Sequence, residues 1–148
     1  MTIKLRQAVE ADFPEILDMI KELALFEKAP EKVSNSVEQM RKEKDFFKCI
    51  LAEDQHGNIM GIALYFFAYY TWVGKSLYLD DLYVKPQFRK NGVGKRLLDE
   101  IFDIARTEKC VRIRWQVLNW NKTALDLYEK IGMTIDDEWI NCDRIIEY

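Results

Sequence analysis

The sequence is poor in the residues that form disulfides and metal sites. Its 148 residues include three cysteines, Cys49, Cys110 and Cys142, and one histidine, His56. The cysteines are far apart and no C-x-x-C pair occurs, so neither a disulfide framework nor a zinc site is expected. His56 lies in a turn-like Gln-His-Gly-Asn run, where we expect a solvated side chain. The sequence therefore predicts no metal site.

A surplus of positive charge and long apolar runs are also missing. The chain has 22 Lys and Arg residues against 25 Asp and Glu residues, which argues against a nucleic-acid binder and suits a cationic partner. No apolar run is long enough to span a membrane, and the chain begins Met-Thr-Ile-Lys-Leu-Arg, without an apolar signal region. We expect a cytoplasmic protein that binds neither nucleic acids nor membranes.

The apolar content is sufficient for one domain. Of all residues 49% are apolar, and no repeat or linker divides the chain, so we expect a single domain over residues 1–148. Apolar patterns predict strands at 3–7, 47–53, 59–70, 76–84 and 111–118, and a closing hairpin of 134–139 and 142–148. Helical periodicity predicts helices at 12–26, 36–44, 95–107 and 121–132, the first with a capping box from Asp12 to Glu15. This order predicts an α/β fold, a mixed, mostly antiparallel sheet of about seven strands with four helices.

The most informative motif is Arg-Lys-Asn-Gly-Val-Gly at residues 89–94, which follows a strand pattern and opens a helix pattern. Gly92 and Gly94 allow successive backbone N–H groups to point at one anion, and the helix N-terminus adds the positive end of its dipole. The motif predicts a pyrophosphate-binding turn. A glycine-rich turn that only caps a surface helix has the same pattern and stays open as an alternative.

Two common phosphate motifs do not fit this turn. A P-loop needs Ser or Thr after Gly-Lys, and here Arg96 follows Gly94 and Lys95. A dinucleotide-binding turn needs a third glycine, and Leu97 occupies that position.

The pattern Arg-x-x-Gly-x-Gly after Leu-Tyr-Leu-Asp-Asp-Leu-Tyr-Val resembles the acyl-CoA signature of the GNAT superfamily of N-acetyltransferases. Residues 20–30, 69–84 and 117–132, together with Trp139, are similar to the spermidine/spermine acetyltransferase branch, whose substrates are diamines and polyamines. The resemblance implies acetyl-CoA as the donor, a small-molecule amine as the acceptor, and a homodimer. It also implies a sheet whose fourth and fifth strands splay apart around the pantetheine arm.

The resemblance further implies which residues bind acetyl-CoA. They come from the fourth strand, from the glycine turn, whose main-chain amides hold the pyrophosphate in the family, and from the last helix. The expected residues are Leu82, Tyr83, Val84, Arg89, Lys90, Asn91, Gly92, Val93, Gly94, Lys95, Asn121 and Ala124.

Acetyl transfer to an amine needs a base, because a primary amine with a pKa of about 10.4 is charged at neutral pH. Asp80 and Asp81 are adjacent on a strand, so we expect them to point to opposite faces of the sheet. By resemblance Asp80 is the base. The branch commonly has the longer glutamate there, so a bridging water is favoured over direct proton abstraction. Alternatively, both carboxylates only pair with nearby lysines.

The resemblance also assigns the general acid and the acceptor site. Tyr128 matches the family's general acid, which protonates the departing CoA thiolate, whereas a tyrosine on the apolar stripe of a helix is otherwise a core residue. Tyr70 stands where the branch can carry an acidic residue, so a shorter diamine or a lysine-like amino acid fits as well as spermidine. Glu27 matches a position that lines the amine pocket in the branch. Independently of the resemblance, Asp137 or Glu138 can pair with a second ammonium group, while a solvated surface face at residues 136–138 stays open as an alternative. The expected acceptor residues are Phe26, Glu27, Asp80, Trp115 and Asp137.

Together these features predict an N-acetyltransferase that moves an acetyl group from acetyl-CoA to a primary amine of a small diamine, polyamine or lysine-like amino acid. Two alternatives stay open, a protein acetyltransferase acting on N-termini or lysines, and a non-catalytic acyl-CoA binding module. The aromatic-rich stretch at residues 65–72 adds support for a homodimer.

Overall fold

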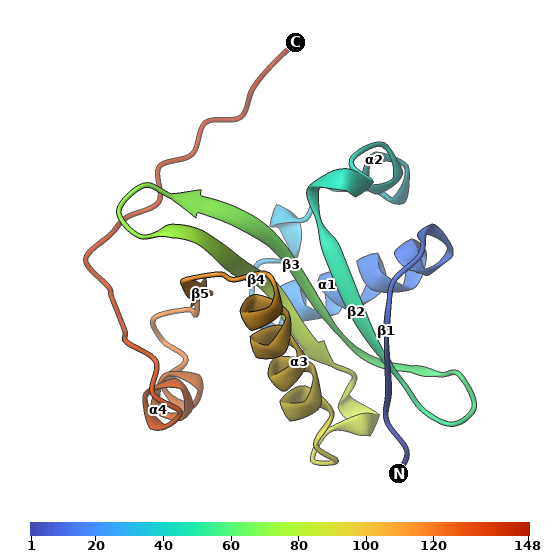
Figure 1. Cartoon of the computed structure of the whole chain (residues 1–148). Coiled ribbons are helices and arrows are strands. Elements are labelled where there is room, and N and C mark those ends of the chain that lie inside the picture. Colours follow the sequence, from blue (N-terminus) through green and yellow to red (C-terminus); the bar gives the residue numbers. More distant parts are fainter. The chain divides into compact units, whose positions relative to one another are not determined.

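The computed structural model describes all 148 residues, which form two compact units, Met1–Gln116 and Val117–Tyr148. Figure 1 labels the helices and strands of both units. No helix in either unit combines the length and the apolar character needed to cross a membrane.

The first unit is built on one five-stranded sheet with the order β1-β2-β3-β4-β5 (Figure 1). Strands β1 to β4 are antiparallel to their neighbours, and β5 is parallel to β4. The bounds are Lys4–Gln7 (β1), Lys48–Glu53 (β2), Ile59–Tyr70 (β3), Gly74–Val84 (β4) and Arg112–Arg114 (β5). All five strands were predicted from the sequence, although β5 is shorter than the expected 111–118.

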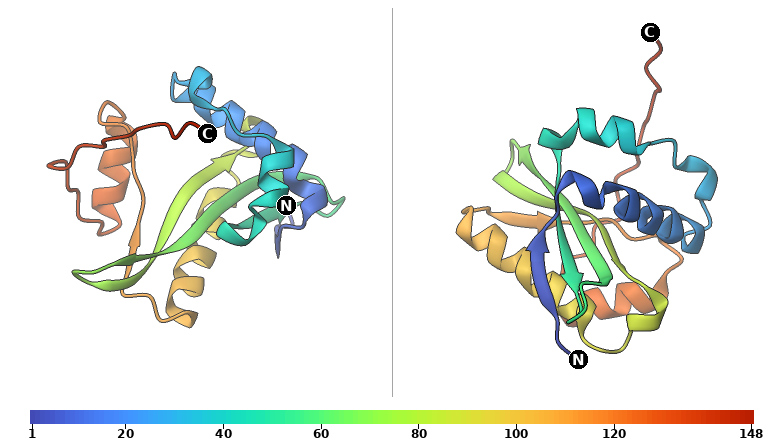
Figure 2. Two further views of the ribbon diagram at one scale, coloured as in Figure 1. Left: turned by 90° about the horizontal axis from the view of Figure 1, so that it is seen from above. Right: turned by 90° about the vertical axis from the view of Figure 1, so that its right-hand side faces the viewer.

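Two long helices, α1 (Phe13–Phe26) and α3 (Val93–Thr107), cover opposite faces of this sheet, and α2 (Val37–Lys42) is short (Figure 2). All three helices were predicted. The buried residues of α3 recur every four positions and so share one stripe that faces the sheet, namely Val93, Leu97, Ile101 and Ala105.

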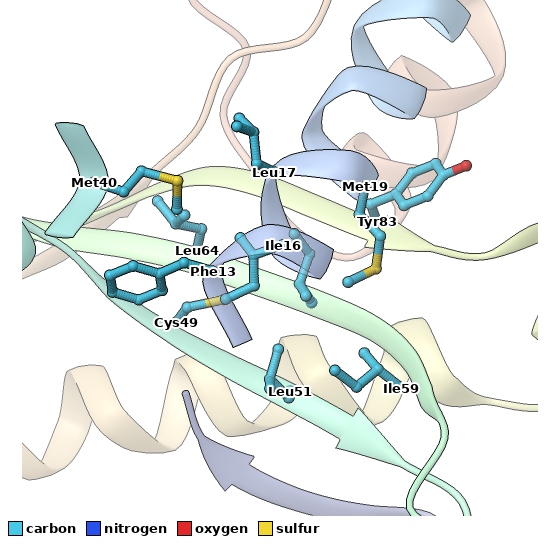
Figure 3. Packing of buried hydrophobic residues seen from close by; sticks show 11 residues of the cluster. Phe13, Ile16, Leu17, Met19, Met40, Cys49, Leu51, Ile59, Leu64 and Tyr83 are labelled. Carbon is cyan, nitrogen blue, oxygen red and sulfur yellow. The ribbon is translucent and has the colours of Figure 1, made fainter. Parts of the chain in front are cut away.

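The core has two layers, one on each face of the sheet. The α1-side cluster packs Ile16 and Met19 of α1 against Leu51 and Leu64 of the sheet (Figure 3). The α3-side cluster packs the alternate strand residues against α3, and it includes Tyr65, Leu77, Leu79, Leu97 and Ile101. Successive strand residues point to opposite faces of the sheet. The cluster to which a side chain belongs therefore shows the face on which it lies.

Strands β4 and β5 are paired over a short distance only. Arg112–Arg114 lies opposite Ser76–Tyr78, whereas β4 continues to Val84 and residues 115–118 form no strand. The later part of β4 therefore has no strand partner on its β5 side. This arrangement agrees with the expected splay between the fourth and fifth strands.

The second unit contains α4 (Lys122–Lys130), the fourth predicted helix. The Asn121 side chain accepts a hydrogen bond from Ala124 N at 3.3 Å, and Gly132 follows the helix with a φ of +92°, so both predicted caps are confirmed. Residues 133–148 form no strand. The predicted closing hairpin at 134–139 and 142–148 is therefore wrong, and the sheet has five strands rather than about seven.

Local hydrogen bonds at Asp136 compete with a strand in this segment. The carboxylate accepts from Glu138 N at 3.2 Å and from Trp139 Nε1 at 2.9 Å. The bond from Glu138 N satisfies a backbone donor without a strand partner. Ile140 and Ile145 beyond it are 87% and 84% exposed, so burial does not favour a strand either.

The predicted capping box of α1 is also wrong, because Asp12 serves another purpose. Its carboxylate makes no cap bond to α1. It accepts hydrogen bonds from Arg6 Nη1 and Nη2, both at 2.8 Å, and from Val9 N at 2.7 Å. Arg6 also pairs with Glu53 of β2. The bidentate bonds to Arg6 pair two opposite charges through two donors, and they fix the chain between β1 and α1.

We expect Asp12→Asn to lower the free energy of unfolding by about 2 kcal/mol near neutral pH. The Arg6 guanidinium holds the pKa of Asp12 below its usual value. A carboxyl whose pKa is lowered by folding stabilises above its unfolded pKa, about 3.9, and this contribution is lost as the pH falls through the folded value. In urea unfolding, the difference from the wild type should shrink below about pH 4.

Asp103→Asn is the control, because the exposed pair of Asp103 and Arg106 is expected to contribute less than about 0.5 kcal/mol. If Asp12→Asn loses the same stability at acid and neutral pH, the ionised carboxylate is not the source of the stabilisation.

Candidate active site

The turn between β4 and α3 has the backbone that the sequence predicted. Gly92 is the N-cap of α3 and has a φ of +80°, in the left-handed region that favours glycine. A Cβ atom at Gly92 would meet no protein atom within 4 Å, so glycine is needed there for the backbone and not for space inside the protein.

Side chains of the turn fix its shape. Arg89 Nε donates to Val84 O at 2.9 Å. Asn91 Nδ2 donates to Phe88 O at 3.2 Å and to Arg89 O at 3.0 Å. These bonds occupy carbonyl groups of the loop, while the first N–H groups of an α-helix have no acceptor within the helix. The turn therefore presents donors and positive charge, which suits a phosphate group.

A cavity of about 410 Å³ opens over this turn. It is lined by Leu82, Val84, Phe88, Arg89, Lys90, Gly92, Val93, Gly94 and Lys95. All but Phe88 were expected to bind acetyl-CoA. Phe88 was missed because the acyl-CoA signature begins one residue later.

Two expected cofactor residues of the first unit do not line this cavity. The Tyr83 side chain belongs to the α1-side cluster and is 7% exposed, so it lies on the other face of the sheet. The Asn91 amide is folded onto the carbonyl groups of its own loop. The side chains of Tyr83 and Asn91 therefore support the turn from outside the cavity.

A β-bulge in β4 shapes the second part of the site. Leu64 pairs with Asp81 and the next residue, Tyr65, pairs with Leu79, so Asp80 is an extra residue in β4. Leu79 and Leu82 both belong to the α3-side cluster, although strict alternation would place only one residue between two side chains of one face. The aspartates therefore share the α1 side of the sheet. The expectation that they point to opposite faces is wrong, because the bulge interrupts the alternation.

The bulge brings three carboxylates into one electrostatic field. Burial raises the pKa of Asp81 to about 7, with further contributions from Asp80 and Glu27. Desolvation also raises the pKa of Asp80, and burial followed by the Asp80 charge raises that of Glu27, the C-cap residue of α1.

These carboxylates take part in none of the ion pairs seen in the structure. None of the nine ion pairs includes Glu27, Asp80 or Asp81, so the alternative in which the aspartates pair with lysines is not seen. The three groups do not form a metal-ligand set either. The site is suited to an ammonium group supplied by a ligand.

The structure does not bring all of the other expected acceptor residues to the site of Glu27, Asp80 and Asp81. Phe26 is exposed beside Glu27 at the end of α1. Trp115 packs in the α3-side cluster with its ring 6.5 Å from that of Phe102, so it lies on the face opposite to Asp80. Asp137 is exposed and belongs to the second unit.

Three further predicted residues, Asn121, Ala124 and Tyr128, also belong to the second unit. The Asn121 side chain is engaged as the cap of α4. Tyr128 is half-buried in the same helix. The predicted roles of these residues in catalysis and acetyl-CoA binding stay predictions.

An enzyme that transfers an acyl group from a CoA thioester to an amine needs an anion-binding turn for the pyrophosphate and uncompensated carboxylates for the ammonium. The first unit supplies both on β4 and in the loop after it, which is the pattern of an acyltransferase. Residues 7–133 match the Acetyltransferase (GNAT) family, and the chain belongs to this family of acyltransferase enzymes.

Known relatives agree with this assignment. The thialysine N-epsilon-acetyltransferase of Sus scrofa is 39% identical over 142 residues, 88% of this chain and 84% of the relative. The spermidine/spermine N(1)-acetyltransferase-like protein 1 of Homo sapiens is 33% identical over 139 residues, 87% of this chain and 20% of that protein. A predicted acetyltransferase solved with acetyl-CoA, from Clostridium acetobutylicum, is 20% identical and has a TM-score of 0.77 over 96% of both chains, a likeness of fold.

Gly94→Ala is expected to weaken acetyl-CoA binding about 10-fold or more without loss of stability. A Cβ atom at Gly94 would lie 3.6 Å from Val84 Cγ2, an ordinary contact, and alanine is favoured over glycine in a helix. The added methyl group would instead occupy the cavity where the pyrophosphate must approach the amides. Calorimetry of acetyl-CoA binding together with thermal unfolding tests both parts.

Gly92→Ala is the comparison, since a φ of +80° makes it cost about 1–2 kcal/mol of stability as well. Wild-type affinity in a folded Gly94→Ala protein would remove this turn as the cofactor site.

Proposed function

We propose that this chain transfers an acetyl group from acetyl-CoA to a primary amine of a small diamine, polyamine or lysine-like amino acid. The observation that carries the proposal is the set of unpaired carboxylates, Glu27, Asp80 and Asp81, on one face of the sheet. Thialysine, the acceptor in the name of several relatives, is one of the lysine-like amino acids. Acetyl-CoA binds at the Gly92 turn, where the cavity and the helix N-terminus support it.

The carboxylates have two roles in this mechanism. They attract the ammonium form of the acceptor, and one of them then removes its proton so that the nitrogen lone pair can attack the thioester carbonyl. Asp81, with a pKa of about 7, holds a proton for much of the time at neutral pH. Asp80 is the more exposed of the pair and serves as the base, directly or through one water.

Collapse of the tetrahedral intermediate breaks the carbon–sulfur bond and releases the thiolate of CoA. Tyr128 donates its phenolic proton to this thiolate, which yields free CoA. The acylated nitrogen loses its second proton, which restores the Tyr128 phenol through solvent, and the proton taken by Asp80 returns to solvent. We also propose that residues 1–148 act as one catalytic domain, supported by a family match that spans both units.

The test compares Tyr128→Phe and Asp80→Asn in steady-state kinetics with a saturating small amine. Tyr128→Phe should lower kcat at least about 10-fold with acetyl-CoA affinity unchanged, because only the proton donor is removed. Asp80→Asn should lower kcat/KM by about 100-fold near neutral pH and recover partly at high pH, where more of the amine is already unprotonated.

Tyr148→Phe and Asp103→Asn are matched controls on the exposed surface and should behave as the wild type. A near wild-type kcat in Tyr128→Phe would make Tyr128 a packing residue. Parallel pH profiles for Asp80→Asn and the wild type would exclude Asp80 as the base.

We also propose a cytoplasmic homodimer. Its support is the exposed aromatic surface at the β3–β4 hairpin, where Tyr69 and Trp72 are 76% and 86% exposed. Light scattering should give twice the chain mass of 17.6 kDa. A mass of one chain that does not change with concentration would rule the dimer out.

A further inference from the structure

Two arginines of β5 lie on the same face of the sheet as the carboxylates. Ile113 and its partner Leu77 point into the α3-side cluster. Arg112 and Arg114, on either side of Ile113, therefore point to the α1 side. Neither arginine was predicted from the sequence to belong to the site.

Tyr70 fixes both guanidinium groups. Arg112 Cζ lies 4.6 Å and Arg114 Cζ 4.8 Å from the centroid of the Tyr70 ring. Such cation–π contacts hold the two planar cations close together, where like charges repel, and leave their edges able to donate hydrogen bonds. A bound anion would relieve this repulsion.

The structure gives these cations no anionic partner. None of the ion pairs includes Arg112 or Arg114. Arg112 Nε is buried and has no hydrogen-bond acceptor. A buried donor without an acceptor costs free energy, so the arrangement favours an acceptor supplied by a ligand.

An aromatic surface lies between the arginines and the carboxylates. Tyr78 stacks on Phe66 with ring centroids 5.1 Å apart. Burial raises the pKa of Tyr78, the Asp80 charge raises it further, and Arg114 opposes the shift. The Tyr78 phenol therefore lies within the electrostatic field of both Asp80 and Arg114. The carboxylates and the arginines belong to one surface.

The spacing between the arginines and Asp80 suits a lysine-like chain. Arg114 lies opposite Tyr78, and Asp80 is two residues further along β4, about 7 Å at the usual rise of a strand. A lysine side chain extended over bonds of about 1.5 Å places its amine roughly 6 Å from its Cα. An amino acid can then present its side-chain amine to Asp80 and its carboxylate to the arginines.

We propose that Arg112 and Arg114 bind the α-carboxylate of the acceptor and make the enzyme select lysine-like amino acids over diamines and polyamines. This inference rests on the proposed function, since it names the acceptor class of the same site. A diamine or polyamine would instead bring a second ammonium group against two guanidinium groups, which is unfavourable. Arg112 and Arg114 are thus specificity-determining residues.

The experiment compares L-thialysine with its primary carboxamide, which has the same length and amine but no negative charge. The wild type should favour the carboxylate form by about 10- to 100-fold in kcat/KM, the effect of charge-assisted hydrogen bonds to one group. In Arg112→Gln and Arg114→Gln this ratio should fall towards one. Arg114→Lys should keep part of the ratio, because lysine retains the charge but not the planar fork.

Arg106→Gln on the exposed surface of α3 is the charge-matched control and should keep the wild-type ratio. Acetyl-CoA affinity, measured by calorimetry, checks that each variant is folded. If the wild type acetylates both compounds equally, or if the ratio survives in both glutamine variants, the inference is overturned and the proposed function stands. If the wild type acetylates neither compound nor any diamine, the proposed function fails and this inference fails with it.

Discussion

The β-bulge in β4 is the constraint on which the site depends. Leu79 and Leu82 both point into the α3-side core, and the strand must fit two residues between them. Moving a buried leucine into water would cost roughly 2 kcal/mol, so the core holds both aspartates on the other face despite their repulsion. The repulsion is relieved when Asp81, with a pKa of about 7, takes up a proton.

The two ends of β4 carry different parts of the site. Beyond Tyr78, β4 has no β5 partner, and the loop after it carries the glycine turn and its cavity. Where β4 is still paired, β5 contributes two guanidinium groups packed on Tyr70. Negative groups on β4 and positive groups on the neighbouring β5 thus lie at different positions along the strand direction, an arrangement that suits an acceptor carrying both charges.

The sequence predicted well whatever depends on local pattern. The strands, the four helices and the turn around Gly92 follow from periodicity and from the preference of glycine for a positive φ. Features that depend on competition between hydrogen-bond partners were not predicted. Asp12 binds Arg6 instead of capping α1, and Asp136 accepts hydrogen bonds from nearby donors where a strand was expected. The bulge at Asp80 was missed because apolar alternation alone does not reveal an extra residue between two buried leucines.

The central claim is that the unpaired carboxylates serve the acetylation of a small amine. The most direct measurement incubates the protein with acetyl-CoA and, separately, with diamines, polyamines, lysine-like amino acids and peptides with free N-termini, and follows CoA release and the acetylated product. The account predicts CoA release coupled to N-acetylation of a small amine, with peptides left unmodified. Acetylation of peptides alone, or acetyl-CoA binding without any CoA release, would contradict it.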